Sequence, residues 1–204
     1  FSTDGWTMCT GSRDKVLNFY DTRRWKLLKT APIYESVSGL ANVPLDGLGP
    51  DARDKKYTMC VASGGTKGDV RIWGFREAGK ATKRGGAAAA ATCTLVGNSE
   101  PQQGHGNTSD GAKSSDDSGK GKAYGITALL CRRSKSQIVS ITEEHFFHFW
   151  RSGDVPLKPM QKCKQIVGYN DEIIDLKFIP TSSGVPGEAP ETKRSDRIVM
   201  AANS

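Results

Sequence analysis

Short segments with strand-like alternation recur along the chain, and tight polar turns separate them. The segments 70–73 (VRIW) and 147–150 (FHFW) alternate apolar and polar residues with the period of two that is typical of a half-buried strand. The turns before them are rich in Gly, Asp and Glu and are typical of β-hairpins. The pattern predicts an all-β fold.

Three segments share one layout, which indicates an internal repeat. The segments 10–21, 63–74 and 140–151 each begin with a small or hydroxylic residue and continue through a polar turn into a strand. Each of these strands ends in an aromatic blade residue: Tyr20, Trp73 and Trp150. The turn carries Asp14 in the first segment and Glu144 in the third. This layout is typical of WD repeats, which form four-stranded β-propeller blades.

The spacing of the blade aromatics fits this interpretation once polar inserts are removed. The aromatics lie 53 and 77 residues apart, whereas a WD-repeat blade has about 40–45 residues. Polar inserts at 44–56 and 97–122, together with the Gly/Ala/Lys run 78–91, account for the excess. We expect the insert 97–122 to be disordered because it is rich in Gly, Ser and Asp.

The expected strands group into blades. One outer strand is expected near 26–30, four strands near 37–43, 57–63, 69–75 and 92–96, four near 125–131, 137–141, 145–150 and 162–167, and two near 173–179 and 197–201. The predicted organisation is a partial blade at 1–30, a second blade at 31–96, a third at 123–167 and the start of a fourth at 168–204 with a loop at 180–196. Because a propeller closes with about 4–8 blades, we expect about three blades plus parts of the flanking ones, as a fragment of a longer protein.

Composition indicates the cellular compartment and the class of partner. The formal net charge is +7, which favours acidic partners such as nucleic acid or acidic protein surfaces. No apolar run is long enough to span a membrane. The five cysteines are scattered and form no C-x-x-C pair, which favours buried thiols in the cytosol or nucleus over disulfides or zinc ligands.

No catalytic, cofactor or metal site is expected. His145 and His148 lie three residues apart on a predicted strand, where they point to opposite faces and cannot hold one ion together. The glycine-rich segment 64–68 lacks the phosphate-loop spacing and precedes a strand, which indicates a hairpin turn. We expect no enzyme activity, no cofactor and no small-molecule substrate.

Longer runs resemble one family in particular. The matching runs are 1–7 (FSTDGWT), 11–21 (GSRDKVLNFYD), 26–35 (KLLKTAPIYE), 166–178 (IVGYNDEIIDLKF) and 199–204 (VMAANS). They resemble the transducin-β-like WD-repeat subunit of the UtpB module in the small-subunit processome. The chain departs from common WD repeats in having Tyr20 where Trp is usual, in having Lys67 at the turn of the second blade, and in lacking the usual Gly-His dipeptide between blades.

The resemblance implies a protein with tandem propellers that acts as a non-enzymatic scaffold. It implies a place in the nucleus and nucleolus, in a ribonucleoprotein that assembles on pre-ribosomal RNA during 18S rRNA maturation and small ribosomal subunit biogenesis. The implied partners are other WD-repeat subunits, with pre-rRNA or snoRNA contacted directly or through them. The alternative is a generic WD-repeat adaptor, such as a ubiquitin-ligase substrate receptor or a signalling hub.

Positive charge is predicted to gather on one propeller face. Loops that join the first strand to the second, and the third to the fourth, lie on one face and carry net positive charge, whereas the other loops carry net negative charge. The residues expected to contact RNA phosphates or an acidic partner are Arg23, Arg24, Arg76, Lys83, Arg84, Arg132 and Arg133.

Overall fold

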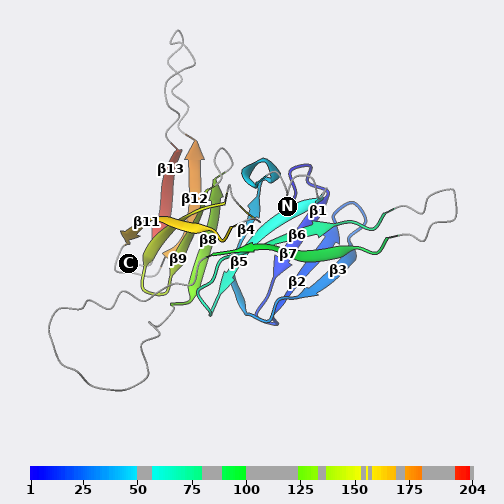
Figure 1. Cartoon of the computed structure of the whole chain (residues 1–204), viewed down its shortest axis with the longest axis horizontal. Coiled ribbons are helices and arrows are strands. Elements are labelled where there is room, and N and C mark those ends of the chain that lie inside the picture. The colour runs from blue at the N-terminus through cyan, green and yellow to red at the C-terminus, as the bar shows by residue number, and fades with distance from the viewer. Residues whose placement is uncertain are drawn as a thin grey trace, which may run out of the picture.

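The computed structural model contains four antiparallel sheets that follow one another along the chain (Figure 1). It describes residues 1–49, 57–79, 89–99, 124–132, 137–152, 155, 158–168, 173–180 and 196–202. Within those ranges the regular elements are strands and one 3-10 turn, η1 (Leu45–Gly47). The all-β class predicted from the sequence is confirmed.

Each sheet is a meander in which consecutive strands pair. The first sheet has β1 (Thr7–Gly11), β2 (Val16–Asp21) and β3 (Lys26–Pro32). The second has β4 (Val37–Val43), β5 (Met59–Gly65), β6 (Arg71–Arg76) and β7 (Thr92–Asn98). The third has β8 (Ile126–Arg132), β9 (Gln137–Thr142), β10 (Phe146–Arg151) and β11 (Gln161–Val167), and the fourth pairs β12 (Ile173–Pro180) with β13 (Asp196–Ala202). We refer to these sheets as blades one to four.

Irregularities in the ladders recur at equivalent positions. The pairing of the third and fourth strands shifts register immediately before the blade aromatic, at Phe19/Tyr20, Ile72/Trp73 and Phe149/Trp150. The pairing of the first and second strands shifts near its start in blades two, three and four. A β-bulge bends a strand and increases its twist. The blades therefore share one backbone design, as a repeat requires.

The hydrophobic core lies between neighbouring blades. Blades one and two enclose a cluster that includes Phe19 and Phe75, whose rings stack with centroids 4.3 Å apart. Blades two and three enclose a second cluster around Trp150 and Ile72. A third cluster joins blade three to Ile173 of blade four. Blades two and three thus each bury their two faces against different neighbours, which is the packing of stacked repeats.

The first strands of successive blades lie side by side, since β8 contacts both β4 and β12. Gly39 of β4 makes this approach possible, because a Cβ atom there would lie 2.9 Å from the Leu129 backbone nitrogen of β8.

The insert expected at 97–122 begins later than predicted. Gly97 and Asn98 belong to β7, and Ser99 is buried with its Oγ accepting a 3.0 Å hydrogen bond from the Val70 N–H. A glycine suits position 97 because Val155 packs where a side chain would be, with a Val155 methyl group 2.5 Å from the ideal Cβ position. The expected disorder was therefore wrong for 97–99, and residues 100–122 lie outside the described residues.

The insert at 44–56 was also only partly a polar loop. Leu48, immediately after η1, is buried in the cluster between blades two and three. The Gly49 N–H donates a 2.9 Å hydrogen bond to the Val155 carbonyl, which ties this segment to the loop after β10. The ends of the predicted loop at 180–196 likewise belong to strands, since β12 ends at Pro180 and β13 begins at Asp196. Among the described residues, no helix has the length and apolarity that a membrane crossing requires.

Candidate interaction surface

A tryptophan–serine hydrogen bond fixes the blade aromatic in blades two and three. The Trp73 indole N–H donates to the Ser63 Oγ at 2.8 Å, and the Trp150 indole N–H donates to the Ser140 Oγ at 2.8 Å. Each tryptophan follows its serine by ten residues. The bond therefore links the second and third strands of the blade through their side chains.

In blade one, Tyr20 and Thr10 occupy the positions of this tryptophan and serine. Tyr20 lies opposite Met8 in the ladder, and Thr10 occupies the position ten residues earlier, where its side chain is exposed. Tyr20 is half-buried, whereas Trp150 is fully buried. The tyrosine keeps the apolar packing of the blade aromatic without an indole N–H to donate.

The turn residues singled out from the sequence are both exposed. Asp14 lies between β1 and β2, where its backbone N–H donates to the Ser12 Oγ at 3.1 Å. Glu144 lies between β9 and β10, and its carboxylate bonds the Tyr124 hydroxyl, which raises the pKa of Tyr124. Their carboxylates therefore face solvent rather than the blade interior.

The buried carboxylate of the blade-to-blade connection is Glu35, which the sequence analysis did not single out. Its Oε1 accepts a 2.9 Å hydrogen bond from the Lys67 N–H, and its Oε2 lies 3.3 Å from Arg71 Nη1. Arg71 also contacts Asp69, with Nη2 3.3 Å from Oδ2. This network joins the connection between blades one and two to the β5–β6 turn of blade two. The connection is where WD repeats usually carry a Gly-His dipeptide, which this chain lacks. A single glutamate three residues after the end of β3 forms no recognisable motif, so only the three-dimensional contact reveals its role.

The structure describes four of the seven predicted basic residues, and each of these four lies in a turn or at the end of a strand. Arg23 and Arg24 are exposed in the β2–β3 turn, Arg76 is exposed at the end of β6, and Arg132 is half-buried at the end of β8. Lys83, Arg84 and Arg133 lie outside the described residues. The structure therefore places Arg23 and Arg24 together and puts Arg76 and Arg132 at the ends of two other strands.

Arg23 is held in place by two neighbours. Its Nε lies 3.4 Å from Asp21 Oδ1, and its guanidinium carbon lies 4.4 Å from the centre of the Trp6 ring. Burial pushes the pKa of the Asp21 carboxyl upward, but hydrogen bonds from the Arg23 backbone and guanidinium outweigh it, so the pKa is lowered. Asp21 is thus ionised at neutral pH and fixes the arginine beside the turn.

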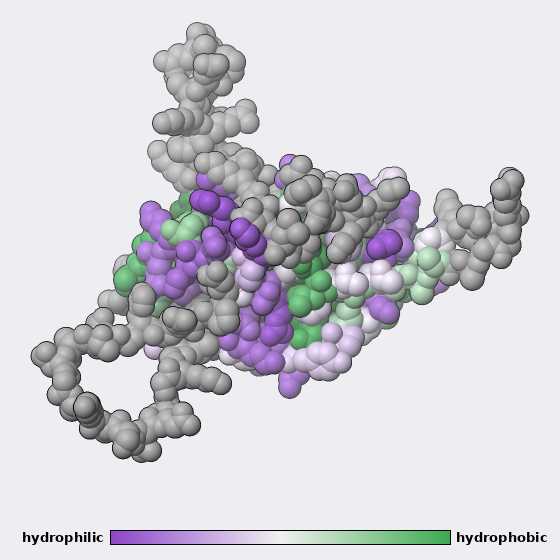
Figure 2. All heavy atoms as spheres, in the orientation of Figure 1, coloured by the Kyte–Doolittle hydropathy of each residue, from purple (hydrophilic) through white to green (hydrophobic). Residues whose placement is uncertain are grey.

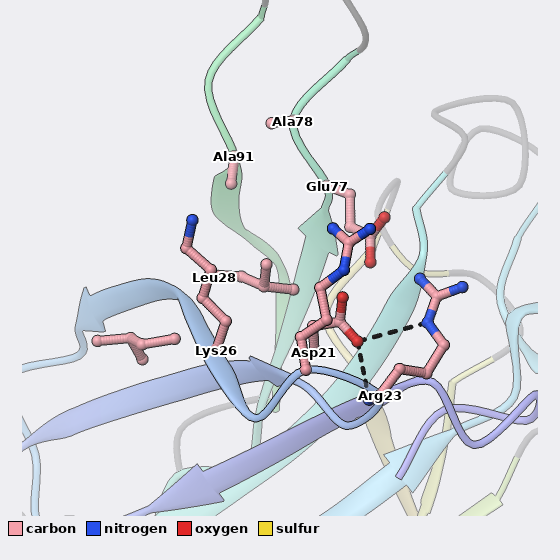
Figure 3. Close-up of a pocket in the computed structure, with 9 residues that line it drawn as sticks. Asp21, Arg23, Lys26, Leu28, Glu77, Ala78 and Ala91 are labelled. Carbon is pink, nitrogen blue, oxygen red and sulfur yellow. Dashed lines mark hydrogen bonds and ion pairs between the residues drawn. The ribbon is translucent and has the colours of Figure 1, made fainter.

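An open cleft of about 470 Å³ adjoins this turn (Figure 3). Lys26 and Leu28 of β3 face Glu77, Ala78 and Ala91, which extend the hairpin of β6 and β7 beyond its strands. The hairpin extension is held by a 3.0 Å hydrogen bond from the Gly79 N–H to the Ala89 carbonyl. The remaining lining residues are Asp21, Arg23, Arg24 and Leu27.

The described residues show no metal-binding cluster, and four of the five cysteines are in settings that disfavour a reactive thiolate. They contain no group of three or more His, Cys, Asp or Glu side chains placed to hold a metal ion. Burial raises the pKa of Cys9, Cys60 and Cys131 to about 12 and that of Cys93 to about 11. These thiols stay protonated at neutral pH and are poor nucleophiles.

Comparison with curated proteins confirms the resemblance seen in the sequence. The chain is 24% identical to rat Transducin beta-like protein 3 over 182 residues, covering 88% of the chain. It is 23% identical to the bovine protein of that name over 204 residues and 22% identical to the human one over 207, covering all of the chain in both cases. The chain spans only 18% of the rat protein's length and 19% of the bovine and human proteins' lengths. No family model matches the chain.

Comparison with solved structures confirms the fold. A chain in the crystal structure of the mitotic checkpoint complex matches 85% of this chain with a TM-score of 0.50, at 14% sequence identity. The match covers 40% of that other chain. Together with the repeated antiparallel meanders, it identifies the architecture as a WD-repeat β-propeller.

Proposed function

We propose that the chain is part of a non-enzymatic WD-repeat scaffold in a nucleolar ribonucleoprotein that assembles on pre-ribosomal RNA. The observation that carries the proposal is the 23% identity to bovine Transducin beta-like protein 3 over an alignment that covers all of the chain. The blades support it, because their conserved design presents loops on two faces while the buried groups serve packing. A propeller of this kind positions partners and needs no reactive group of its own.

Within that role, the basic loops contact RNA phosphates or acidic protein segments. Arg23, Arg24, Arg76 and Arg132 stand at ends of strands that share one face by strand order, and Lys83, Arg84 and Arg133 belong to the same loops. Contacts from Arg and Lys to phosphates position a partner without reading its sequence. The same surface would recruit other WD-repeat subunits through their acidic segments.

A generic adaptor role, for example as a ubiquitin-ligase substrate receptor, is the competing function. Both roles use the same fold, so the distinction lies in what the whole protein assembles with. The experiment is affinity purification of the tagged whole protein from nucleolar extract, followed by identification of its proteins and RNA. We expect pre-ribosomal RNA, snoRNA and other WD-repeat subunits. Recovery of ubiquitin-ligase subunits without pre-ribosomal RNA would favour the adaptor.

A further inference from the structure

The cleft between the β2–β3 turn and the extension of the β6–β7 hairpin has the features of a peptide-binding site. Its volume of about 470 Å³ falls within the range of ligand pockets, roughly 300–1,000 Å³. Its lining combines Leu27, Leu28, Ala78 and Ala91 with three basic side chains and two acidic ones. A lining that mixes apolar and basic side chains suits a segment that carries both apolar and acidic side chains.

We propose that this cleft binds an acidic peptide segment of a partner protein, with an apolar side chain against Leu28 and Ala91 and carboxylates against Arg24 and Lys26. The proposal rests on the proposed scaffold function and deepens it by giving one of its surfaces a partner chemistry. It applies to the cleft alone. Arg76 and Arg132 keep the role proposed above, which is contact with RNA phosphates or acidic protein segments.

The cleft is organised before a partner arrives. Two hydrogen bonds tie the β2–β3 turn to the segment before β1. The Thr22 N–H donates to the Trp6 carbonyl at 3.0 Å, and the Thr22 hydroxyl donates to the Gly5 carbonyl at 2.8 Å. The Asp21 contact and the Trp6 ring hold Arg23. Because the turn is already ordered, binding costs less conformational entropy than it would with a free loop.

Trp25, next to Arg24 in the turn, gives independent support. Its φ is +49°, in the left-handed region where Asn or Gly is favoured, and its side chain is 71% exposed. A tryptophan in this position gains little from packing within the chain, and the strained backbone opposes it. Tryptophan and arginine are the residue types enriched at the energetic centre of protein–protein interfaces. An exposed Trp25 between Arg24 and Lys26 therefore fits a contact with another protein.

The cleft favours a peptide over RNA. Four of its nine lining residues are leucine or alanine. They offer apolar contacts to a peptide side chain, but no charge for a phosphate and no aromatic ring for a base to stack on. The face shown in Figure 2 carries both hydrophilic and apolar areas among the described residues.

The test measures binding of labelled peptides to the whole protein by fluorescence anisotropy. The probes are acidic peptides in which one leucine is flanked by Asp and Glu residues, the same peptides with Lys in place of the acidic residues, and an oligouridine. We expect the acidic peptides to bind, and the double reversal Arg24→Glu with Lys26→Glu to weaken them by about tenfold or more. The control is the double reversal Arg13→Glu with Lys67→Glu, which changes the net charge by the same amount at exposed residues of the β1–β2 and β5–β6 turns, outside the cleft lining.

Trp25→Asn separates binding from folding. Asparagine tolerates the left-handed conformation, so this variant should fold at least as well and still bind the acidic peptides more weakly. Equal loss in the Arg13/Lys67 control, no loss in the Arg24/Lys26 double reversal, or failure of the acidic peptides to bind more tightly than the Lys peptides would overturn the proposal. Tighter binding of oligouridine that the double reversal abolishes would overturn it in favour of RNA. These binding constants do not depend on the nucleolar purification, so either idea can fail alone.

Discussion

The Trp150 indole N–H and the Ser140 Oγ form a 2.8 Å hydrogen bond in a fully buried setting, whereas the same bond between Trp73 and Ser63 is only partly buried. The two bonds have the same length and the same ten-residue spacing, so they differ mainly in access to water. A buried donor that loses its partner bears the full desolvation penalty, while a partly exposed one finds water instead. The two blades therefore provide an internal comparison.

We expect Ser140→Ala to destabilise blade three by about 1–3 kcal/mol and Ser63→Ala to destabilise blade two by roughly 0.5–1 kcal/mol. Hydrogen exchange of the whole protein measures this locally, through the protection of amides in β9 and β10 or in β5 and β6. Trp150→Phe with Ser140→Ala is the control, because it removes donor and acceptor together. Equal effects of the two serine substitutions would contradict the argument from burial.

A second prediction concerns the ion pair between Glu35 and Arg71. Glu35→Ala removes the acceptor of the Lys67 N–H and leaves Arg71 with Asp69 and the Ile33 carbonyl, so we expect blade two to lose about 1–3 kcal/mol. Glu35→Gln keeps a hydrogen-bond acceptor and should cost less. Exchange in β5 and β6 is the measurement, and Asp14→Asn in the exposed β1–β2 turn should change stability by less than about 0.5 kcal/mol. A larger effect of Asp14→Asn than of Glu35→Ala would show that the turn aspartate matters more.

Much of the strand pattern is predictable from the sequence, because alternation and turn residues act over a few positions. The strand at Val37–Val43 lies where the pattern put it, and those beginning at Thr92 and Gln137 start at the predicted residues. The repeated register shifts were not predictable, since one residue out of step in strands of six or seven residues is too small a change to detect in the alternation. The resemblance between blades is therefore stronger in the backbone than in the residues.

The interaction surface was predictable only in part. Charge along the chain placed Arg23 and Arg24 in an exposed turn, but the cleft forms because β3 of one blade faces a hairpin extension of the next, some fifty residues away in sequence. The burial of Leu48 and Glu35 has the same origin: each lies in a segment of turn-like composition whose partner belongs to a different element. Contacts between blades leave no periodic signal in either segment.

A third prediction concerns acid sensitivity at His148. Burial, and then the positive charge of Lys162, lowers the pKa of His148 to about 4, although a contact with Gln165 partly opposes this. Its unfolded-state pKa is about 6.5, so the unfolded chain binds more protons between these values and stability falls as the pH drops through that window.

We expect blade three to lose about 1–2 kcal/mol between pH 7 and pH 5. Protection of the β9 and β10 amides at the two pH values, corrected for the intrinsic exchange rate, measures the loss. His148→Gln should remove most of this pH dependence while keeping a polar side chain of similar size. A wild-type protein whose blade three is equally protected at both pH values would show that His148 is not held neutral.

The last prediction concerns the basic face beyond the cleft. Arg132 ends β8, and Arg133 follows it in a loop that strand order places on the same face as the β2–β3 turn. If these arginines contact phosphates of pre-ribosomal RNA, the double reversal Arg132→Glu with Arg133→Glu should weaken RNA binding by the whole protein. Each lost phosphate contact should also remove roughly 0.7–0.9 from the slope of log affinity against log salt concentration.

The matched control is Arg13→Glu with Lys67→Glu, which changes the net charge by the same amount on exposed turns of the opposite face. A long-range effect of net charge would lower RNA affinity equally in both double variants, whereas a local contact lowers it only in the first. Filter binding of the whole protein to a pre-ribosomal RNA fragment at several salt concentrations distinguishes the two. Equal slopes in the wild type and the Arg132/Arg133 variant would mean that these arginines are solvated and that RNA is held elsewhere or through partner subunits.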